Sequence, residues 1–491
     1  MKSAVLEPQP RPPAEPGLRP LAKWPVLTIA GLVAVAHLVM SAVGDYWIDE
    51  VYMLAAGKYH LDWGYVDQPP LAPLIAAAMD WIAPGSMIVL RLPAVLATAA
   101  AVVMCALLVR ELGGDRRAQV LAAGAGATGL WTALVGHWVT PYTFEPLQWL
   151  VLSWLLVRWI RLREQGDGDD RLLLVFGLVL GVAMQTKFQV AILCAALLIS
   201  VLLVGPRDVL RRPMFWGGVG IAFVIAAPTV LWQALHGWPQ LQMGAVVAEE
   251  SPLLSGGRSG TAVTLVLYAG VAGAALFLIG LWKLFRSAEL RPYRFFAVAS
   301  ILMYAFFVAT AARPYYLIGM YGVVIAAGLV ALQRRREAKP SRWGWTAWFP
   351  YAASAALAGY MVWVSTVISG SFGMPTSDEI ARDTSAAFTA LPPDQRAHTA
   401  VVGDSYIAAS MLEVNRTRYE LPETYSPHRG YGYFGQPDEQ IDSVLFVGDP
   451  EEIRQHFTEV RKIKDGTLPI WLCTAKIGTW SQIWPQLKTL S

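Results

Sequence analysis

GDYWIDEVYMLAAGKYHLDWGYVDQPPL, residues 44–71, is the stretch that decides how this chain folds. Acidic and aromatic side chains crowd together here, directly after the first long apolar segment. Carboxylates are costly to keep at a membrane edge and usually remain there for function, whereas Tyr and Trp collect in the headgroup layer. Asp49 and Glu50 precede VYMLAA, so we expect them in the first turn of a short helix, whose dipole favours ionised carboxylates. The stretch is therefore either the polar part of a site at the membrane surface or an interfacial helix with solvated acids.

The composition indicates a membrane protein. Of 491 residues, 55% are hydrophobic and only 15% are charged, which is too apolar for a soluble globule of this size. The net charge of +3 gives no indication of a nucleic-acid partner. Cys105, Cys194 and Cys473 are read as small buried hydrophobes, not as a disulfide framework. Residues 1–20 are rich in proline and mixed charge and are predicted to form a disordered cytoplasmic tail.

Apolar segments of nearly membrane-spanning length recur along the chain. We predict about eleven transmembrane helices, followed by a small α/β domain. The predicted spans are Trp24–Val43, Met87–Val109, Ala118–Val135, Pro146–Trp159, Leu172–Thr186, Phe188–Val204, Phe215–Leu235, Ala262–Leu284, Phe295–Ala312, Tyr315–Leu332 and Trp345–Ser365. Leu71–Ala83 is apolar but short, and we interpret it as a re-entrant or interfacial helix.

Basic residues fix the orientation of these spans. Every even-numbered span is followed by basic residues, as at Arg110 and at Arg334–Arg336, whereas odd-numbered spans are followed by almost no Lys or Arg. The positive-inside rule then places the N-terminus in the cytoplasm and the C-terminus outside. We predict a multi-pass protein of the plasma (inner) membrane whose acidic loop faces away from the cytoplasm.

Few polar residues share the outer face with Asp49. Lys187 and Arg313 lie in very short outer turns, where they either bind an anionic ligand or extend along the helix ends toward the headgroups. His137 is either an interfacial residue or a ligand contact. Glu145 is either functional or an acid that complements a helix N-terminus.

The order of these residues resembles family 39-like glycosyltransferases, the protein mannosyltransferase and aminoarabinose transferase-like membrane enzymes of the GT-C class. The first outer loop carries the resemblance, with Asp49-Glu50 followed by the aromatic residues and by YVDQPPL at 65–71. Three further segments extend it over roughly the first 370 residues. They are GHWVTPYTFEPLQWL at 136–150, where Glu145 stands near the family's usual Asp, GLVLGVAMQTKFQVAIL at 177–193, and RPYYLIGMYGVVIAAG at 313–328.

The resemblance implies transfer of a hexosyl or pentosyl group from a polyprenyl-phosphate sugar to a hydroxyl of a protein, lipid or polysaccharide of the cell envelope. Asp49 would be the catalytic base, since a positioned carboxylate can take the hydroxyl proton. Glu50, the second predicted catalytic residue, would orient donor or acceptor together with Asp67, and Lys187 with Arg313 would hold the phosphate. The expected substrate-binding residues are Tyr65, Asp67, His137, Glu145, Lys187, Arg313 and Tyr315. No cofactor is required by the sequence, although a divalent cation could bridge the acids and the phosphate.

Residues 370–491 differ in composition from the transmembrane domain, which we place at residues 21–369. Ala400–Asp404, Ser443–Asp449 and Ile470–Ala475 are predicted strands, alternating with helices at Ser405–Val414, Pro450–Ile463 and Trp480–Leu490. We expect Asp404-Ser405 to begin a helix as its cap. The aromatic, Gly-rich loop Thr424–Pro437 suits either sugar stacking or packing onto the membrane domain.

Two other functions fit parts of the pattern. A transporter or flippase of lipid-linked sugars would place paired acids near mid-membrane, within broken helices related by a repeat. The acids cluster instead in an outer loop, and no such repeat is evident. A ligase that transfers an oligosaccharide would share the architecture and differ in the size of the donor.

Overall fold

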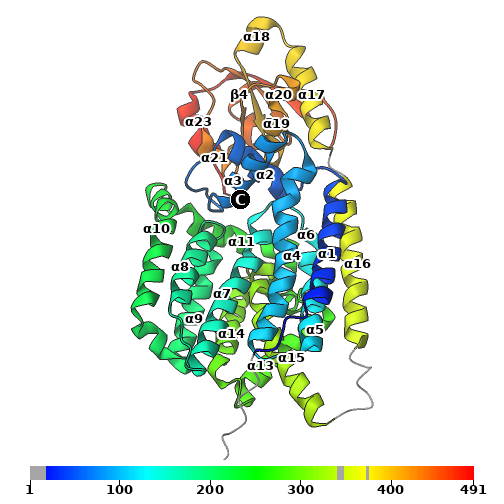
Figure 1. The fold of residues 1–491 in the computed structure, drawn as a ribbon. Coiled ribbons are helices and arrows are strands. Elements are labelled where there is room, and N and C mark those ends of the chain that lie inside the picture. The colour runs from blue at the N-terminus through cyan, green and yellow to red at the C-terminus, as the bar shows by residue number, and fades with distance from the viewer. Residues whose placement is uncertain (1–17, 340–347, 372–374, 491) are drawn as a thin grey trace, which may run out of the picture.

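Long apolar helices form the body of the molecule, and a mixed sheet with its own helices sits on one end of it (Figure 1). The computed structural model describes residues 18–339, 348–371 and 375–490. The predicted fold class, a helical membrane domain with a small C-terminal α/β domain, is confirmed. The predicted tail at residues 1–20 lies outside the described residues except for residues 18–20, as does the beginning of the span predicted from Trp345.

Among the described residues, five helical segments are long and apolar enough to cross a membrane. They are α1 (Lys23–Ser41), α4 (Met87–Glu111), α10 (Pro213–Leu235), η2 with α14 (Arg291–Ala309), and η3 with α15 (Pro314–Ala338). The other helices of the body are α5 (Arg116–Ala127), α6 (Leu130–Val135), α7 (Pro141–Glu164), α8 (Arg171–Met184), α9 (Gln189–Val204), η1 (Arg207–Arg211), α11 (Pro239–Ser255), α12 (Gly257–Leu267), α13 (Gly270–Arg286) and α16 (Trp348–Ser371). The total of eleven spans stays a prediction.

Two predicted spans are broken helices. The third divides into α5 and α6, and the eighth divides into α12 and α13, which are bent by 91°. The breaks lie against each other, because the Leu130 amide donates to the Tyr268 carbonyl at 3.0 Å. Gly270 has a left-handed backbone conformation with φ +76°, and a Cβ there would lie 2.7 Å from the Thr128 carbonyl oxygen. The two breaks thus satisfy backbone groups that apolar surroundings would otherwise leave unpaired.

Two short helices lie between the helical body and the C-terminal domain. α2 (Ile48–Tyr59) and α3 (Leu71–Ile82) pack together closely, since a Cβ at Gly57 would meet the Pro73 carbonyl oxygen. α3 exposes Trp81 and Ile82, which fits the helix expected at the membrane surface. α2 is covered along most of its length, and Glu50 is fully buried. The alternative of an interfacial helix with solvated acids therefore does not hold for α2.

The C-terminal domain is a five-stranded mixed sheet with order β2-β1-β3-β5-β4. β1 pairs in parallel with β2 and β3, while β5 runs antiparallel to β3 and β4. Its elements are α17 (Ser377–Thr389), α18 (Pro393–Ala397), β1 (Thr399–Gly403), α19 (Tyr406–Val414), α20 (Arg416–Tyr419), β2 (Thr424–Tyr425), α21 (Tyr431–Phe434), β3 (Ser443–Val447), α22 (Glu451–Arg454), β4 (Phe457–Lys464), β5 (Ile470–Lys476) and α23 (Trp480–Leu487).

Most of the domain agrees with the sequence prediction, with one correction. The three predicted strands are β1, β3 and β5, and the Ser405 hydroxyl caps α19 by accepting from the Ala408 amide at 3.2 Å. The helix predicted at Pro450–Ile463 is wrong, because α22 ends at Arg454 and β4 follows. β4 lies at the sheet edge with most of its side chains exposed. Its sequence therefore lacks the alternation of apolar and polar residues that predicts a half-buried strand.

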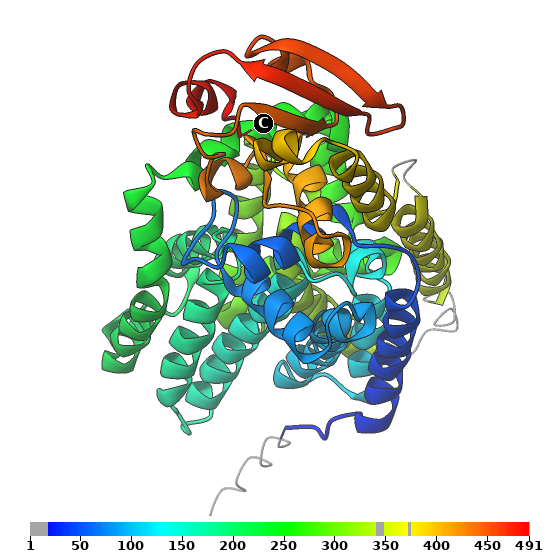
Figure 2. The same ribbon diagram turned by 90° about the horizontal axis from the view of Figure 1, so that it is seen from above.

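The domain meets the helical body through α19, which packs on α2. Figure 2 shows the sheet from above, with α2 and α3 at the centre of the molecule beside the C-terminal helices. The loop from Thr424 to Pro437 joins this contact. A Cβ at Gly430 would lie only 1.9 Å from the Tyr52 hydroxyl, and Phe434 stacks on His60 with ring centroids 4.2 Å apart. The loop therefore packs onto the membrane domain, one of the two roles expected of it.

Candidate functional site

Asp49 lies where the two parts of the molecule meet. It occupies the first turn of α2, and each of its carboxylate oxygens accepts one tyrosine hydroxyl. Tyr142, at the start of α7, donates at 3.1 Å, and Tyr406, at the start of α19, also donates at 3.1 Å. Hydrogen bonds to a charged acceptor hold it more strongly than neutral pairs do. The carboxylate is thus oriented by one hydroxyl from the helical body and one from the C-terminal domain.

Stacked aromatic rings fix the start of α2. Trp47, in extended conformation, is the N-terminal cap residue, and its ring stacks on Trp138 with centroids 4.3 Å apart and planes 3° from parallel. Its indole nitrogen also donates to the Tyr142 hydroxyl at 2.7 Å. The tryptophan that begins the helix therefore also positions the tyrosine that binds Asp49.

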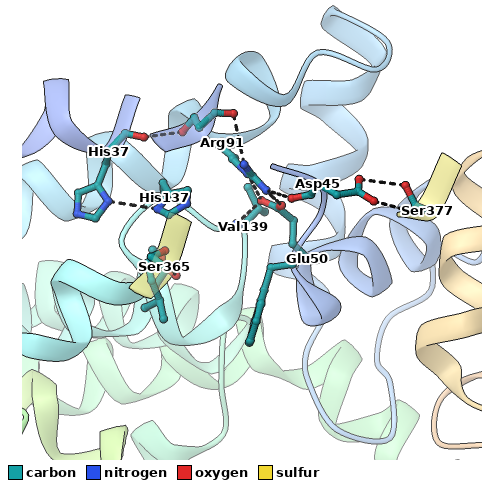
Figure 3. Close-up of polar contacts among 12 residues, drawn as sticks. His37, Asp45, Glu50, Arg91, His137, Val139, Ser365 and Ser377 are labelled. Carbon is teal, nitrogen blue, oxygen red and sulfur yellow. Dashed lines mark hydrogen bonds and ion pairs between the residues drawn. The ribbon is translucent and has the colours of Figure 1, made fainter. Parts of the chain in front are cut away.

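Glu50, which follows Asp49 in the chain, lies in a buried ion pair with Arg91 (Figure 3). The Arg91 side chain, from α4, donates through Nε at 3.0 Å and through Nη2 at 2.7 Å to Oε2. The Val139 amide donates to Oε1 at 3.0 Å. Both side chains of the pair are fully buried, so Glu50 ties α2 to α4 and to the segment that leads into α7.

The same arginine reaches toward the C-terminal domain. Arg91 Nη2 donates to the Asp45 carbonyl oxygen at 2.9 Å, and the Asp45 carboxylate in turn accepts from Ser377 (Figure 3). The Ser377 amide and hydroxyl donate at 2.5 and 3.0 Å, at the start of α17. Four segments distant in sequence are thus linked through Arg91.

Glu145 and Lys187 form a second buried pair beside Asp49. Lys187, in the turn between α8 and α9, has its Nζ 3.6 Å from Glu145 Oε2. The ammonium also faces the rings of Tyr315 and Tyr316, with centroids at 4.7 and 4.3 Å, distances at which a cation is attracted to an aromatic face. Lys187 interacts electrostatically with Asp49, so this pair belongs to the same site.

Two arginines from different domains share one carboxylate near the site. Arg313 follows α14, Arg429 belongs to the C-terminal loop, and Glu250 lies on α11. Glu250 accepts from Arg313 through Oε2 and from Arg429 through Oε1. Arg429 also lies over the Tyr406 ring, with its guanidinium carbon 4.9 Å from the centroid.

Asp67 completes the acidic side of the site. Its Oδ1 accepts from the Tyr52 hydroxyl at 3.3 Å. Burial raises the pKa of the Asp67 carboxyl from 3.8 to about 6, an effect that Arg429 opposes and Asp49 reinforces. Asp67 is therefore close enough to both residues to share their electrostatic environment.

The structure brings together most, but not all, of the residues predicted for the site. Asp49, Asp67, Glu145, Lys187, Arg313 and Tyr315 gather around one region. Tyr65 faces backbone instead, donating to the His60 carbonyl at 3.0 Å. His137 is buried with its Nδ1 3.3 Å from His37 Nδ1 (Figure 3). Tyr65, His137 and Glu50 therefore contact residues outside the group around Asp49, namely His60, His37 and Arg91.

Five residues around the site were missing from the predicted set. They are Arg91, Tyr142, Glu250, Tyr406 and Arg429. Tyr142 could have been found, since it shares the polar segment at 136–150 with Glu145. Tyr406 and Arg429 carry no local signal, because they reach Asp49 only through the docking of a separate domain.

The side chains of the site are arranged as paired charges. Within residues 18–339, 348–371 and 375–490, no three His, Cys, Asp or Glu side chains come together as a potential metal site. Each Asp49 oxygen already accepts a tyrosine hydroxyl, and the neighbouring positive charges are Lys187, Arg313 and Arg429. These cations can provide the electrostatic stabilisation that a developing phosphate charge requires.

Known proteins share both the fold and part of the sequence. Residues 67–232 match the family described as Dolichyl-phosphate-mannose-protein mannosyltransferase. Among solved structures, ArnT from Cupriavidus metallidurans is similar in the apo state (TM-score 0.63, 13% identity) and bound to undecaprenyl phosphate (TM-score 0.59, 15% identity). Each comparison covers 91% of this chain and 97% of ArnT. The oligosaccharyltransferase of Archaeoglobus fulgidus, in complex with Zn and sulfate, is similar over 91% of this chain and 72% of its own, with TM-score 0.53 and 12% identity. No curated protein matches the sequence significantly.

The fold is similar to that of ArnT and of the archaeal oligosaccharyltransferase, as expected for the predicted GT-C class of membrane glycosyltransferases. Within that class, the resemblance to the family 39-like glycosyltransferases that was predicted from the sequence is confirmed by the family match and by the likeness to ArnT.

Proposed function

We propose that the protein transfers a sugar from a polyprenyl phosphate to an acceptor hydroxyl at the outer face of the plasma (inner) membrane, with Asp49 as the base. The observation that carries the proposal is the arrangement of Asp49. Its carboxylate is held by two hydroxyls and interacts electrostatically with Lys187, which in turn lies near Arg313. A base next to anion-binding groups is what this reaction requires.

The chemistry is a single displacement. The acceptor oxygen attacks the anomeric carbon, its proton passes to Asp49, and the bond between that carbon and the phosphate oxygen breaks. Polyprenyl phosphate leaves with the electron pair, and the anomeric configuration inverts. Lys187 and Arg313 stabilise the leaving phosphate, while Glu145 and Tyr315 hold Lys187 in place.

The remaining predicted residues have different roles in this proposal. Asp67 contacts donor or acceptor on the side of Asp49 that faces Arg429. Glu50 positions Asp49 by fixing α2 against Arg91, and Tyr65 and His137 position the loops on which substrates lie. The donor sugar is a hexosyl or pentosyl group, and the acceptor is a protein, lipid or polysaccharide. The transmembrane domain comprises residues 21–369, and residues 370–491 form an extracytoplasmic domain.

Two alternatives share this scaffold. A ligase for lipid-linked oligosaccharides would use the same base, and the fold similarity to an oligosaccharyltransferase favours keeping it as the second candidate. A transporter or flippase of lipid-linked sugars would have no need for a carboxylate held by two tyrosines.

The test is Asp49→Asn, which keeps the size of the side chain but removes its charge and basic lone pair. We expect transfer from a purified polyprenyl-phosphate sugar in proteoliposomes to fall at least about a hundredfold, equivalent to roughly 2.7 kcal/mol of barrier. Donor binding should change much less. Glu249→Gln, an exposed acid on α11, is the matched control and should retain full activity.

Thermal stability is measured on both variants in parallel. Near-normal turnover by a stable Asp49→Asn protein would exclude Asp49 as the base and would favour the transporter.

A further inference from the structure

Glu250 occupies a position suited to an anion. Its carboxylate lies between Arg313 of the helical body and Arg429 of the C-terminal domain, with one oxygen bound to each guanidinium. The two arginine side chains are only 14% and 16% exposed, whereas the Glu250 side chain is 28% exposed. The arginines are thus largely enclosed, while the acid between them retains a path to solvent.

The cations around Glu250 have unused hydrogen-bonding capacity. In the described part of the chain, Arg313 Nη1, Arg429 Nε and Lys187 Nζ are buried without a hydrogen-bond partner. Buried donors are normally paired, and each exception needs an explanation. A carboxylate has two oxygens and satisfies one donor from each arginine here. A phosphate has more acceptor oxygens and could engage the remaining donors as well.

The charge balance opposes adding a phosphate while Glu250 stays in place. The carboxylates Asp49, Asp67, Glu145 and Glu250 already outnumber the cations Lys187, Arg313 and Arg429. Another anion in this largely enclosed region would increase the excess of negative charge, which is costly where the dielectric constant is low. Exchange of the Glu250 carboxylate for a phosphate avoids that cost.

We propose that Arg429 is a third cationic ligand of the donor phosphate and that the Glu250 carboxylate holds the phosphate position until the donor displaces it. The inference rests on the proposed function, because it concerns the same lipid-linked donor. α11 is suited to the exchange, since Gly237 precedes it and Gly256 and Gly257 follow it, all with φ between +68° and +78°. A few such residues can absorb a change of backbone direction at the ends of a moving element.

The experiment measures binding of undecaprenyl phosphate to the full-length protein in nanodiscs, with inorganic phosphate as a second probe. Glu250→Gln removes the competing charge and should lower the Kd for the lipid about tenfold. Arg429→Gln should raise it about tenfold, and Arg429→Lys should recover part of the loss. Glu249→Gln on α11 and Arg461→Gln on β4, both exposed, are matched controls that should bind as the wild type does.

The double variant separates a phosphate ligand from a residue that only holds Glu250. If Arg429 contacts the phosphate, Arg429→Gln still weakens binding in the Glu250→Gln background. If Arg429 only neutralises Glu250, its substitution has no effect in that background, and the inference is wrong. Weaker or unchanged lipid binding by a folded Glu250→Gln protein also overturns it. Tight binding of inorganic phosphate alone would identify a site for the free ion instead of the lipid.

Failure of this inference is distinguishable from failure of the proposed function. If Lys187→Ala and Arg313→Ala weaken lipid binding and Asp49→Asn abolishes transfer, the enzyme assignment stands, whatever Arg429 does. If the wild-type protein neither binds the lipid phosphate nor transfers sugar, both proposals fall together.

Discussion

Two hydroxyls hold Asp49, and neither alone fixes both of its oxygens. Tyr142 binds Oδ2 and Tyr406 binds Oδ1, so each oxygen has its own donor from its own domain. A base must be held within a fraction of an ångström of its productive geometry, and this requires support from surrounding residues. The tyrosines are therefore expected to act on the rate through the orientation of Asp49.

Removing either hydroxyl should slow transfer without weakening donor binding. A hydrogen bond to a charged group contributes about 1.5–3 kcal/mol, so Tyr142→Phe and Tyr406→Phe should each lower kcat by roughly ten- to hundredfold, with KM nearly unchanged. Steady-state kinetics in proteoliposomes measure both constants, and Tyr419→Phe in the same domain as Tyr406 is the control. A loss confined to KM would contradict an orienting role.

Asp67 should make stability depend on pH in a defined window. Its pKa is raised from 3.8 to about 6, so the folded protein binds this proton more tightly than the unfolded chain does. Stability from this group is therefore present in full below about pH 4 and is lost as pH rises to about 6, an effect of at most about 3 kcal/mol. The thermal midpoint of Asp67→Asn should fall less between pH 5 and 7 than that of the wild type. Asp438→Asn, which is exposed, should keep the wild-type dependence, and an equal dependence in Asp67→Asn would exclude this origin.

Helix α2 connects the site to the rest of the molecule. Asp49 lies on the side of α2 that faces Lys187. The next residue, Glu50, forms a buried ion pair with Arg91. Adjacent residues on a helix point in directions about 100° apart, so the two acids necessarily face different surroundings. The sequence predicted that both lie in the first turn of a helix, but it could not show which one would be buried, because the partner Arg91 is 41 residues away.

The buried pair should matter more for stability than for chemistry. Removing one partner of a buried ion pair leaves an uncompensated charge, which typically costs about 3–5 kcal/mol. We expect Glu50→Gln to lose stability of this order and Glu50→Gln/Arg91→Met to recover part of it, measured by unfolding in detergent. Transfer by the folded fraction of Glu50→Gln should exceed that of Asp49→Asn. Unchanged stability of Glu50→Gln would show that the pair contributes little.

There are physical reasons why the sequence did not predict some of the helix breaks and one strand. α5 and α6, and likewise α12 and α13, read as continuous apolar segments, and their breaks depend on a contact between Leu130 and Tyr268. β4 is an exposed edge strand whose side chains carry no alternating pattern. Hydrophobic periodicity reports burial, so it identified the buried strands and failed where partners far away in sequence decide the conformation.

Residues of both domains form the candidate site. The predicted set contained the contributions of the helical body, since Asp49, Lys187 and Arg313 stand out as charges in an apolar sequence. Tyr406 and Arg429 come from a domain whose docking no local pattern encodes. Contacts such as Asp45 with Ser377, and His60 with Glu413 at 3.0 Å, set the position of that domain.

The proposed orientation requires the C-terminal domain to lie outside the cytoplasm. Basic residues follow the even-numbered predicted spans, and such residues are retained on the cytoplasmic side. A tag placed after Ser491 should therefore react with a membrane-impermeant label in intact cells, whereas one placed before Met1 should react only after permeabilisation. The reverse pattern would put Asp49 on the cytoplasmic face.

The separation of Asp49 and Tyr406 by 357 positions has a consequence for biosynthesis. Asp49 emerges from the ribosome early, yet the hydroxyl and the guanidinium that complete its surroundings are translated only after nearly all of the helices have been inserted. We expect a nascent chain arrested before residue 406 to be inserted but inactive, and activity to appear only once the last domain has crossed the membrane and docked. Under the proposed function, this order of synthesis would keep a partly assembled protein from acting on the lipid-linked sugars around it.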